Sequence, residues 1–264
     1  MQEGHAAGRA VALMYHALAA GGGVPAGQDP HYTLGAGAFE RQLDAVARHG
    51  GGGSAQSWLR GGGHRLLITF DDGHLSNYEI ALPALARRGM SADFFVNPAM
   101  VGRPGFASWA QLREMAGAGM SIQSHGYDHV YLTGLSPRAL RSTLSAAREE
   151  ISQRVGVATT LLAPPGGRMP HGMAAVAREC GYTHVLSSRP GWIAGRGRGV
   201  VLPRMAVTAA TGEAAFQRWL AADTRAILRE GARYGGLALA KRLLGDDRYE
   251  RMRHRALVLL RGQA

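Results

Sequence analysis

Two clusters of polar residues follow short apolar runs of the sequence, and their residue types are those that hold metals and move protons. Asp71-Asp72-Gly73 places two adjacent carboxylates directly after the run Arg65–Phe70. His125 and His129 are four residues apart and follow the run Met120–Ser124. Two histidines at this spacing can reach one metal ion, and one carboxylate would complete a His₂Asp site with open coordination positions. Asp-Asp-Gly alone is equally typical of a simple turn, so the interpretation depends on the pairing of the two clusters.

Two further runs end in groups that could serve the same site. Pro164–Gly167 predicts a rigid backbone turn at a strand end, and Arg168 follows it. Tyr15-His16 closes the run that begins at Ala10. His16 is compatible with a catalytic role and also with a hydrogen-bonded histidine of the core.

The clusters fit a chain in which short strands alternate with helices. Strands are expected at Ala10–His16, Arg65–Phe70, Ala92–Val96, Met120–Ser124, Thr160–Ala163, Thr183–Ser187 and Val200–Val207. Helices are expected at Ala38–His49, Leu75–Arg88, Ser108–Gly117, Ser136–Val155, His171–Cys180, Gly212–Ala222 and Thr224–Arg233. This alternation predicts a parallel α/β barrel, in which catalytic side chains gather at the C-terminal ends of the strands. The glycine-rich stretches Gly21–Gly27 and Gly50–Gly63 predict flexible loops that are long enough to act as lids.

Composition narrows the class of protein. The chain has 264 residues, of which 46% are apolar, so it can bury a sizeable core. One cysteine excludes a disulfide scaffold, and no apolar run reaches the length of about 18 residues that a membrane-spanning helix needs. The net charge of +11 suggests nucleic acid or an anionic membrane as a partner. Because no nucleic-acid recognition motif accompanies the charge, we expect no nucleic-acid partner.

Both ends of the chain bear on its location in the cell. Val11–Ala19 could pass as a short signal peptide, but Glu3 and the Tyr-His interruption favour a buried strand, so we expect a cytoplasmic protein rather than a secreted one. We place the barrel at residues 1–224 and a basic helical extension at residues 225–264. Residues 234–264 predict an amphipathic helix that either lies on the inner face of a membrane or covers the outside of the barrel.

These motifs, in this order, resemble those of the polysaccharide deacetylases, the NodB-homology or carbohydrate esterase family 4 proteins. Thr69–Gly73 matches the family's Thr-Phe-Asp-Asp-Gly motif, and His125–His129 is similar to its His-(Ser/Thr)-x-x-His motif, with Gly126 in the small position. Pro164–Gly167 is similar to its proline-glycine motif. The resemblance implies a distorted (β/α)7-type barrel and metal-dependent removal of N-acetyl groups from sugars.

The resemblance also implies a role for each residue of the clusters. The ligands of one divalent metal, most simply zinc with cobalt, nickel or manganese as alternatives, would be Asp72, His125 and His129. Asp71 would be the general base, and a backbone N–H near Pro165 or Gly166 would stabilise the oxyanion. Tyr127 would line the substrate groove, unless it only packs there. The implied substrate is an N-acetylated sugar, glycan or exopolysaccharide precursor.

The chain departs from the family pattern at two positions. The family places a proton-donating histidine on its last strand, whereas Val200–Val207 contains no histidine. The run that ends at His16 is similar to that motif moved to the N-terminus, as in the poly-N-acetylglucosamine deacetylases, so His16 is the expected general acid. Ala163 stands where the family often has the arginine that holds the base. Arg168 or Arg204 could replace that arginine, or each could be a solvated loop charge.

The leading hypothesis is therefore a metal-dependent N-deacetylase. Two alternatives stay open: an amide or cyclic-imide hydrolase of the same fold that acts on a small molecule, and a weakly catalytic barrel that binds glycan or membrane. The shape of the site distinguishes a polymer deacetylase from a small-molecule hydrolase, because a long open groove suits a polymer and a closed pocket suits a small molecule.

Overall fold

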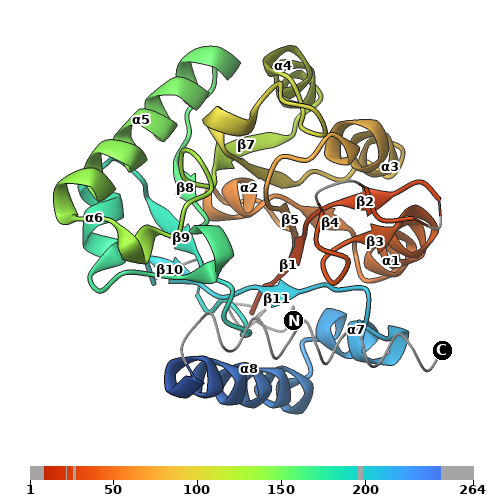
Figure 1. Ribbon diagram of the computed structural model, residues 1–264. Helices are drawn as coiled ribbons and strands as arrows, with labels where there is room; N and C mark the ends of the chain where they lie inside the picture. Colours follow the sequence, from red (N-terminus) through yellow and green to blue (C-terminus); the bar gives the residue numbers. More distant parts are fainter. Residues whose placement is uncertain (1–8, 22, 26–27, 196–198, 245–264) are drawn as a thin grey trace, which may run out of the picture.

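The computed structural model describes residues 9–21, 23–25, 28–195 and 199–244, with the side chains of the last helix described as far as residue 236. Its main feature is a parallel sheet that curves into a ring (Figure 1). In spatial order the strands are β10 (Val201–Leu202), β9 (His184–Leu186), β8 (Leu161–Leu162), β7 (Ser121–Ser124), β6 (Asp93–Val96), β5 (Leu66–Phe70), β1 (Val11–Tyr15) and β11 (Met205–Ala206). The predicted parallel α/β barrel is confirmed.

The first strand of the chain lies between two strands that come later in the sequence. β1 pairs in parallel with β5 on one side and with β11 on the other, so Leu13 lies opposite both Ile68 and Met205. At the two ends of the sheet, β10 and β11 are separated by only Pro203 and Arg204. This two-residue link carries the chain from the neighbour of β9 to the neighbour of β1, and thereby closes the ring. The single strand expected at Val200–Val207 is divided at this link.

Helices cover the outside of the ring (Figure 1). They are α1 (Ala36–Arg48), α2 (Ala55–Leu59), α3 (Leu82–Ala86), α4 (Trp109–Gly117), α5 (Pro137–Val155), α6 (Met173–Glu179), α7 (Glu213–Leu220) and α8 (Thr224–Leu244). Single turns of tighter or wider helix are η1 (Asn77–Ala81), η2 (Pro98–Met100), η3 (Leu132–Gly134) and η4 (Pro165–Gly167). A second parallel sheet pairs β2 (Leu18–Ala19) with β3 (Leu34–Gly35). The helix expected at Leu75–Arg88 is present, and its first part, η1, is a wider turn that continues directly into α3.

Alternation along the strands divides the core into two layers. On β1, Leu13 and Tyr15 pack under the helices, whereas Ala12 belongs to the layer inside the barrel. On β5, Phe70 also packs under the helices. Since successive side chains of a strand point to opposite faces, the next residue, Asp71, continues the inward face at the end of the strand.

The stretch Gly50–Gly63 is regular structure rather than the flexible lid that its glycine content predicts. β4 (Gly52–Gly53) pairs with the first residues of β5, and α2 follows with Ser54 as its N-cap. A Cβ on Gly52 would lie 2.7 Å from Cδ1 of Ile68, so close packing rather than flexibility explains this glycine. Because β4 pairs with the start of β5, the stretch lies far from the strand ends that it would have to cover. The other expected lid, Gly21–Gly27, lies partly outside the described residues.

The last helix packs against the barrel at its beginning. α8 starts at Thr224, as expected, and runs past Arg233 to Leu244. Ile227, in its first turn, is 1% exposed and belongs to the main core. Residues 245–264 of the expected extension lie outside the described residues, so membrane contact through residues 234–264 stays a prediction. Within the described part of the chain, no helix has the length and apolar character needed to cross a membrane.

Candidate active site

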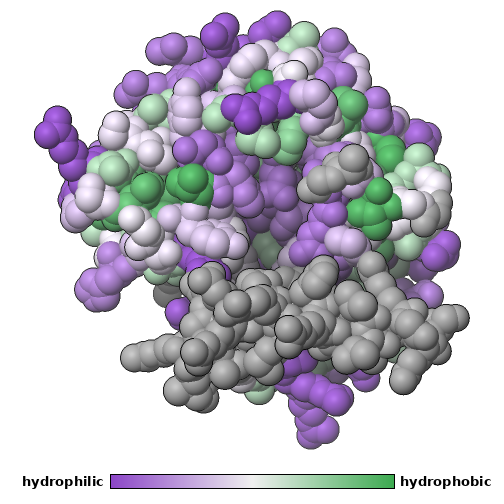
Figure 2. Space-filling view, viewed as in Figure 1, coloured by the Kyte–Doolittle hydropathy of each residue, from purple (hydrophilic) through white to green (hydrophobic). Residues whose placement is uncertain are grey.

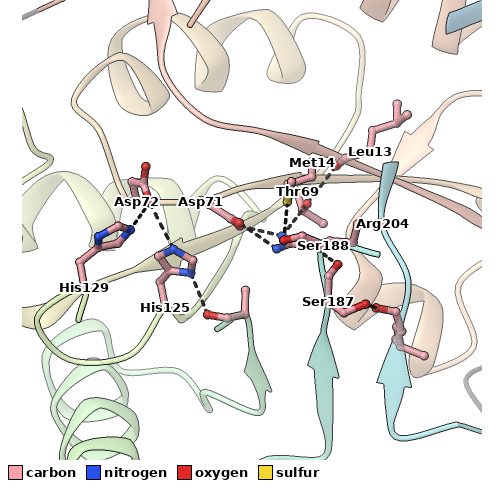
Figure 3. Close-up of polar contacts among 12 residues, drawn as sticks. Leu13, Met14, Thr69, Asp71, Asp72, His125, His129, Ser187, Ser188 and Arg204 are labelled. Atoms are coloured by element: carbon pink, nitrogen blue, oxygen red, sulfur yellow. Dashed lines mark hydrogen bonds and ion pairs between the residues drawn. The ribbon is translucent and has the colours of Figure 1, made fainter. Parts of the chain in front are cut away.

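Asp71 and Asp72 leave the end of β5 in different directions (Figure 3). Asp71 points toward Arg204, whereas Asp72 points toward the two histidines of the second cluster. The backbone causes this divergence, because Asp72 has a φ of 74° and Gly73 has a φ of 71°. A non-glycine residue in this left-handed region is uncommon, and such strain is typical of functional sites. The Asp-Asp-Gly sequence is therefore both a turn and part of the site.

Asp72, His125 and His129 form a cluster with the geometry of a metal site. Oδ1 of Asp72 lies 3.2 Å from Nε2 of His125 and 3.1 Å from Nε2 of His129. One ligand atom from each residue lies within 4.8 Å of the other two. Two imidazole nitrogens and one carboxylate oxygen are donors that suit zinc and leave coordination positions open. The residues thus fit the predicted divalent metal, although its identity stays a prediction.

The two histidines are held to different degrees. His125 is 2% exposed, and its Nδ1 lies 2.7 Å from the carbonyl oxygen of Ala163. Because a carbonyl oxygen only accepts hydrogen bonds, Nδ1 carries the proton and Nε2 keeps its lone pair for a metal. The side chain of His129 is 44% exposed. His125 is therefore fixed in the interior, whereas His129 is accessible to solvent.

Arg204 replaces the arginine that is missing at position 163. Its Nη1 and Nη2 donate to Oδ1 and Oδ2 of Asp71 at 2.6 and 2.8 Å. Its Nη1 also lies 3.2 Å from Oγ1 of Thr69, and its Nε donates to the carbonyl oxygen of Ser187 at 3.2 Å. Arg204 is 0% exposed, so the alternative of a solvated loop charge is wrong for this residue. Arg204, in the two-residue link between β10 and β11, is thus the ion-pair partner of Asp71.

The surroundings favour the ionised form of both carboxylates. Burial alone would raise the pKa of Asp71, but the positive charge of Arg204 and the nearby His125 hold it below its usual value. Burial likewise opposes ionisation of Asp72, whereas hydrogen bonds with His125 and His129 hold its pKa well below the usual value. At neutral pH, Asp71 is therefore available to accept a proton.

His16 lies at the end of β1 and lines the same cavity as Asp71 and Asp72. Its ring packs against Tyr32, with 4.5 Å between the ring centroids. Its buried Nδ1 has no hydrogen-bond partner among the described residues, unlike the hydrogen-bonded core histidine that the sequence left open. Burial lowers the pKa of His16, and the negative charges of Asp72 and Asp71 oppose this shift.

A polar network that the sequence did not predict holds the backbone around His16. Nδ2 of Asn77 donates to the carbonyl oxygen of His16 at 2.9 Å. The backbone N–H of Leu18 donates to Oγ of Ser76 at 2.8 Å, and Nδ1 of His74 lies 2.8 Å from the same oxygen. His74 is only 5% exposed, and it belongs to this network.

The turn after β8 forms one wall of the cavity. Gly166 has a φ of 61°, and a Cβ there would lie 2.5 Å from Cε1 of Tyr131, so the close approach requires glycine. Because Pro165 has no N–H, only Gly166 of this pair can offer an amide N–H to an oxyanion. The guanidinium of Arg168 lies 4.1 Å from the ring centroid of Tyr131, and Arg168 lines the cavity.

The aromatic side chain beside the cavity is not the expected one. The hydroxyl of Tyr127 donates to Oε2 of Glu150 on α5 at 3.0 Å, and Tyr127 does not line the cavity. The expectation that it lines the groove is therefore wrong, because its hydroxyl is held by α5. Tyr131, four residues later, lines the cavity instead.

The cavity has a volume of about 400 Å³, and Figure 2 shows it as a hydrophilic hollow on this face of the molecule. Most of its lining comes from strand ends and from residues 28–33. The final helices add Trp219 on α7 and Glu230, Arg233 and Tyr234 on α8. Sequence reasoning missed this contribution, although residues 227, 230 and 234 have the spacing of one helical face.

The fold and the site together define an α/β barrel with a His₂Asp metal-type cluster at the carboxyl ends of its strands. Residues 60–185 match the family model described as Polysaccharide deacetylase. The matched residues include both polar clusters, and the match confirms the resemblance to this family that the motifs indicate.

Relatives agree with this assignment. The Bacillus subtilis protein YxkH, named as an inferred polysaccharide deacetylase, is 33% identical over 156 residues, which are 59% of this chain and 56% of that protein. The chain spans about half the length of the curated relatives it matches. The structure of IcaB from Ammonifex degensii is similar with a TM-score of 0.66 and 26% identity, and the match covers 82% of this chain and 98% of that one. The Streptococcus pyogenes deacetylase PplD, solved in complex with acetate, has a TM-score of 0.69 at 21% identity over 76% of this chain and 93% of that one, a likeness of fold alone.

Proposed function

We propose that this protein is a metal-dependent N-deacetylase that acts on an N-acetylated carbohydrate. The observation that carries the proposal is that a His₂Asp cluster, an arginine-paired carboxylate and a buried histidine face one cavity. The match to the family model and the relative named as an inferred polysaccharide deacetylase support the same activity.

Asp72, His125 and His129 would hold the metal. When bound, a divalent ion such as zinc supplies Lewis acidity, which lowers the pKa of a water molecule and polarises an acyl oxygen. Asp71 accepts the proton of the attacking water, since Arg204 fixes its carboxylate and favours its ionised form. This division of work explains why the adjacent carboxylates point in different directions.

His16 donates a proton to the leaving amine. Burial lowers the pKa of its imidazole, so the ring must first take up a proton, and the two nearby carboxylates favour that protonated form. Tyr32 and the hydrogen bond from Asn77 restrict its position. The amide N–H of Gly166 is the group we propose for stabilising the oxyanion.

A second candidate function is hydrolysis of a small amide or cyclic imide by the same residues. The cavity volume of about 400 Å³ favours a small substrate over a long polymer, and this observation keeps the candidate open. An N-acetylated mono- or oligosaccharide, free or carried as an exopolysaccharide precursor, satisfies both the cavity and the family. The cytoplasmic location expected from the sequence is part of this proposal.

Acetate release tests the proposal. Purified protein is loaded with zinc, cobalt, nickel or manganese, or treated with a chelator, and incubated with N-acetylated mono-, oligo- and lipid-linked sugars. Asp71→Asn serves as the inactive control, because it removes the base and leaves the metal ligands in place. Release that depends on both the metal and Asp71 supports deacetylation. Hydrolysis of small amides or imides without any release of acetate from sugars would overturn it in favour of the second candidate.

A further inference from the structure

The beginning of α8 is fixed against the barrel, although the sequence suggested a separate extension. Ile227 is 1% exposed within the main core. Oδ1 of Asp223 accepts the backbone N–H groups of Arg225 and Ala226 at 2.8 and 3.1 Å, which caps the start of the helix. Nη1 of Arg9 donates to Oγ1 of Thr224 at 3.0 Å. The side chains that follow are therefore held in a defined position.

The face of α8 that begins at Ile227 continues over the site. Glu230 and Tyr234 follow at the three- and four-residue steps of one helical face, and both line the cavity that contains Asp72 and His125. Arg233 also lines it, and its Nε lies 3.2 Å from Oε2 of Glu230. An apolar face thus becomes polar and aromatic where it reaches the cavity.

The loops after β7 and β8 present similar chemistry on the same cavity. There the guanidinium of Arg168 lies 4.1 Å from the ring centroid of Tyr131, and both residues line the cavity. Two phenol rings and two arginines therefore line the cavity that contains the proposed metal ligands. Flat rings with adjacent hydrogen-bond donors suit a sugar, which has apolar ring faces and hydroxyl groups at its edges.

The size of the cavity limits what these groups can hold. Its volume of about 400 Å³ is near the lower end of the range of about 300–1,000 Å³ for small-molecule sites. A polymer that reacts in its middle needs space on both sides of the reacting ring. Glu230, Arg233 and Tyr234 line the cavity and so limit its extent where it meets α8.

We propose that α8 is part of the substrate site, and that Tyr234 and Arg233 restrict the substrate to a short N-acetylated saccharide or to the end of a chain. This inference rests on the proposed function, because it names the substrate class of the same site. Tyr234 contacts the ring next to the reacting one, and Arg233, oriented by Glu230, donates hydrogen bonds to its hydroxyl groups.

The test compares Tyr234→Ala and Arg233→Ala with Arg229→Ala, a matched arginine that is exposed on α8 and does not line the cavity. The measurement is kcat/KM for acetate release from N-acetylglucosamine oligomers of increasing length. The unaltered protein is expected to gain nothing beyond the shortest oligomers. In Tyr234→Ala, kcat/KM for a disaccharide should fall by about 3- to 10-fold, the worth of one aromatic contact, while long oligomers lose less. Arg233→Ala should likewise lower kcat/KM more for the disaccharide than for long oligomers, and Arg229→Ala should leave kcat/KM unchanged at every length.

A binding measurement separates this inference from the proposed function. Calorimetry on the Asp71→Asn background gives the affinity for the N-acetylated disaccharide with and without Tyr234→Ala. If no sugar is deacetylated but Tyr234→Ala still weakens binding, the proposed function fails, whereas the role of α8 in saccharide binding is supported. If acetate is released and both α8 variants behave like Arg229→Ala, the inference on α8 is overturned and the function stands.

Discussion

Arg204 and Asp71 form a buried bidentate ion pair, in which Nη1 and Nη2 of the guanidinium donate to the two carboxylate oxygens at 2.6 and 2.8 Å. The side chains are 0% and 3% exposed, and they come from segments 133 residues apart in the sequence. Two parallel hydrogen bonds fix the orientation of a carboxylate as well as its charge. The pair therefore determines how Asp71 presents itself to the cavity.

Arg204→Met should shift the acid limb of the kcat/KM profile to higher pH. Burial raises the pKa of Asp71, but the charge and hydrogen bonds of Arg204, together with the nearby His125 and His16, hold it below its usual value. A general base works only when deprotonated, so activity is lost as the pH falls through its pKa. Without the arginine that pKa rises, and the loss begins at higher pH. An acid limb that stays in place, measured against Arg189→Met as an exposed control, would show that Asp71 is not the base.

The same substitution should also destabilise the protein. Removing one partner of a buried ion pair costs about 3–5 kcal/mol, because the other charge is left without compensation. Asp71→Asn added to Arg204→Met should therefore recover part of the loss, as measured by urea unfolding. The stabilisation is present above the unfolded pKa of aspartate, about 3.9, and is lost as the pH falls through the lower folded pKa. A double variant no more stable than Arg204→Met would contradict this account.

Removing an exposed metal ligand should weaken zinc binding strongly without unfolding the barrel. Mutation of a residue that only hydrogen-bonds to a metal ligand lowers metal affinity by about 10–100-fold. His129→Ala should lower zinc affinity by more than this, because it removes a direct donor. The side chain is 44% exposed, so the melting temperature of the metal-free protein should change little. Titration calorimetry of chelator-treated protein measures the affinity, with the exposed His171→Ala as control. Equal zinc affinity in both variants would exclude this site.

His16→Ala should slow amide hydrolysis much more than ester hydrolysis. An amine must be protonated before it leaves, whereas an activated aryl oxide leaves without help. We expect kcat for an N-acetylated sugar to fall by about 10²–10⁴-fold, the usual contribution of a general acid. Hydrolysis of an activated aryl acetate, measured in parallel, should fall by much less. Near-native turnover of the amide, or equal losses on both substrates, would remove His16 as the acid.

Gly52→Ala should destabilise the fold although Gly52 belongs to a glycine-rich stretch. A Cβ there would lie 2.7 Å from Cδ1 of Ile68 and 3.0 Å from Cγ1 of Val46, and overpacking of this kind costs about 1–3 kcal/mol. Gly117→Ala is the matched control, since nothing lies within 4 Å of its Cβ position on α4. That change should stabilise the protein by about 0.4–1 kcal/mol. Chemical denaturation compares the two, and equal stabilities would mean that β4 is not packed as described.

The residues at strand ends could be predicted from the sequence because their positions follow from short-range rules. Asp71, Asp72, His125 and His129 each follow an apolar run, and parallel strands bring such ends together. The serine N-caps were predictable for the same reason, and Ser108 and Ser136 each accept a backbone N–H at the start of α4 and α5.

Features that depend on distant contacts could not be predicted in the same way. Arg204 and Arg168 were equal alternatives, because only the closure of the ring shows which guanidinium reaches Asp71. The regular structure near Gly52 was missed since it depends on pairing with β5, not on local propensity. Tyr127 was assigned to the groove because a motif does not specify where a side chain points, and Glu150 on α5 holds its hydroxyl.

The two-residue link between β10 and β11 has a consequence for how the protein folds. During synthesis the N-terminal part of the chain emerges first, so β1 can pair with β5 long before β11 exists. The pairing of Leu13 with Met205 is among the most non-local in the molecule, and such contacts form slowly. Arg204 reaches Asp71 only when this link is in place. Completion of the barrel and formation of the Arg204–Asp71 ion pair are therefore one late folding event, and an incomplete chain lacks the arginine that orients Asp71.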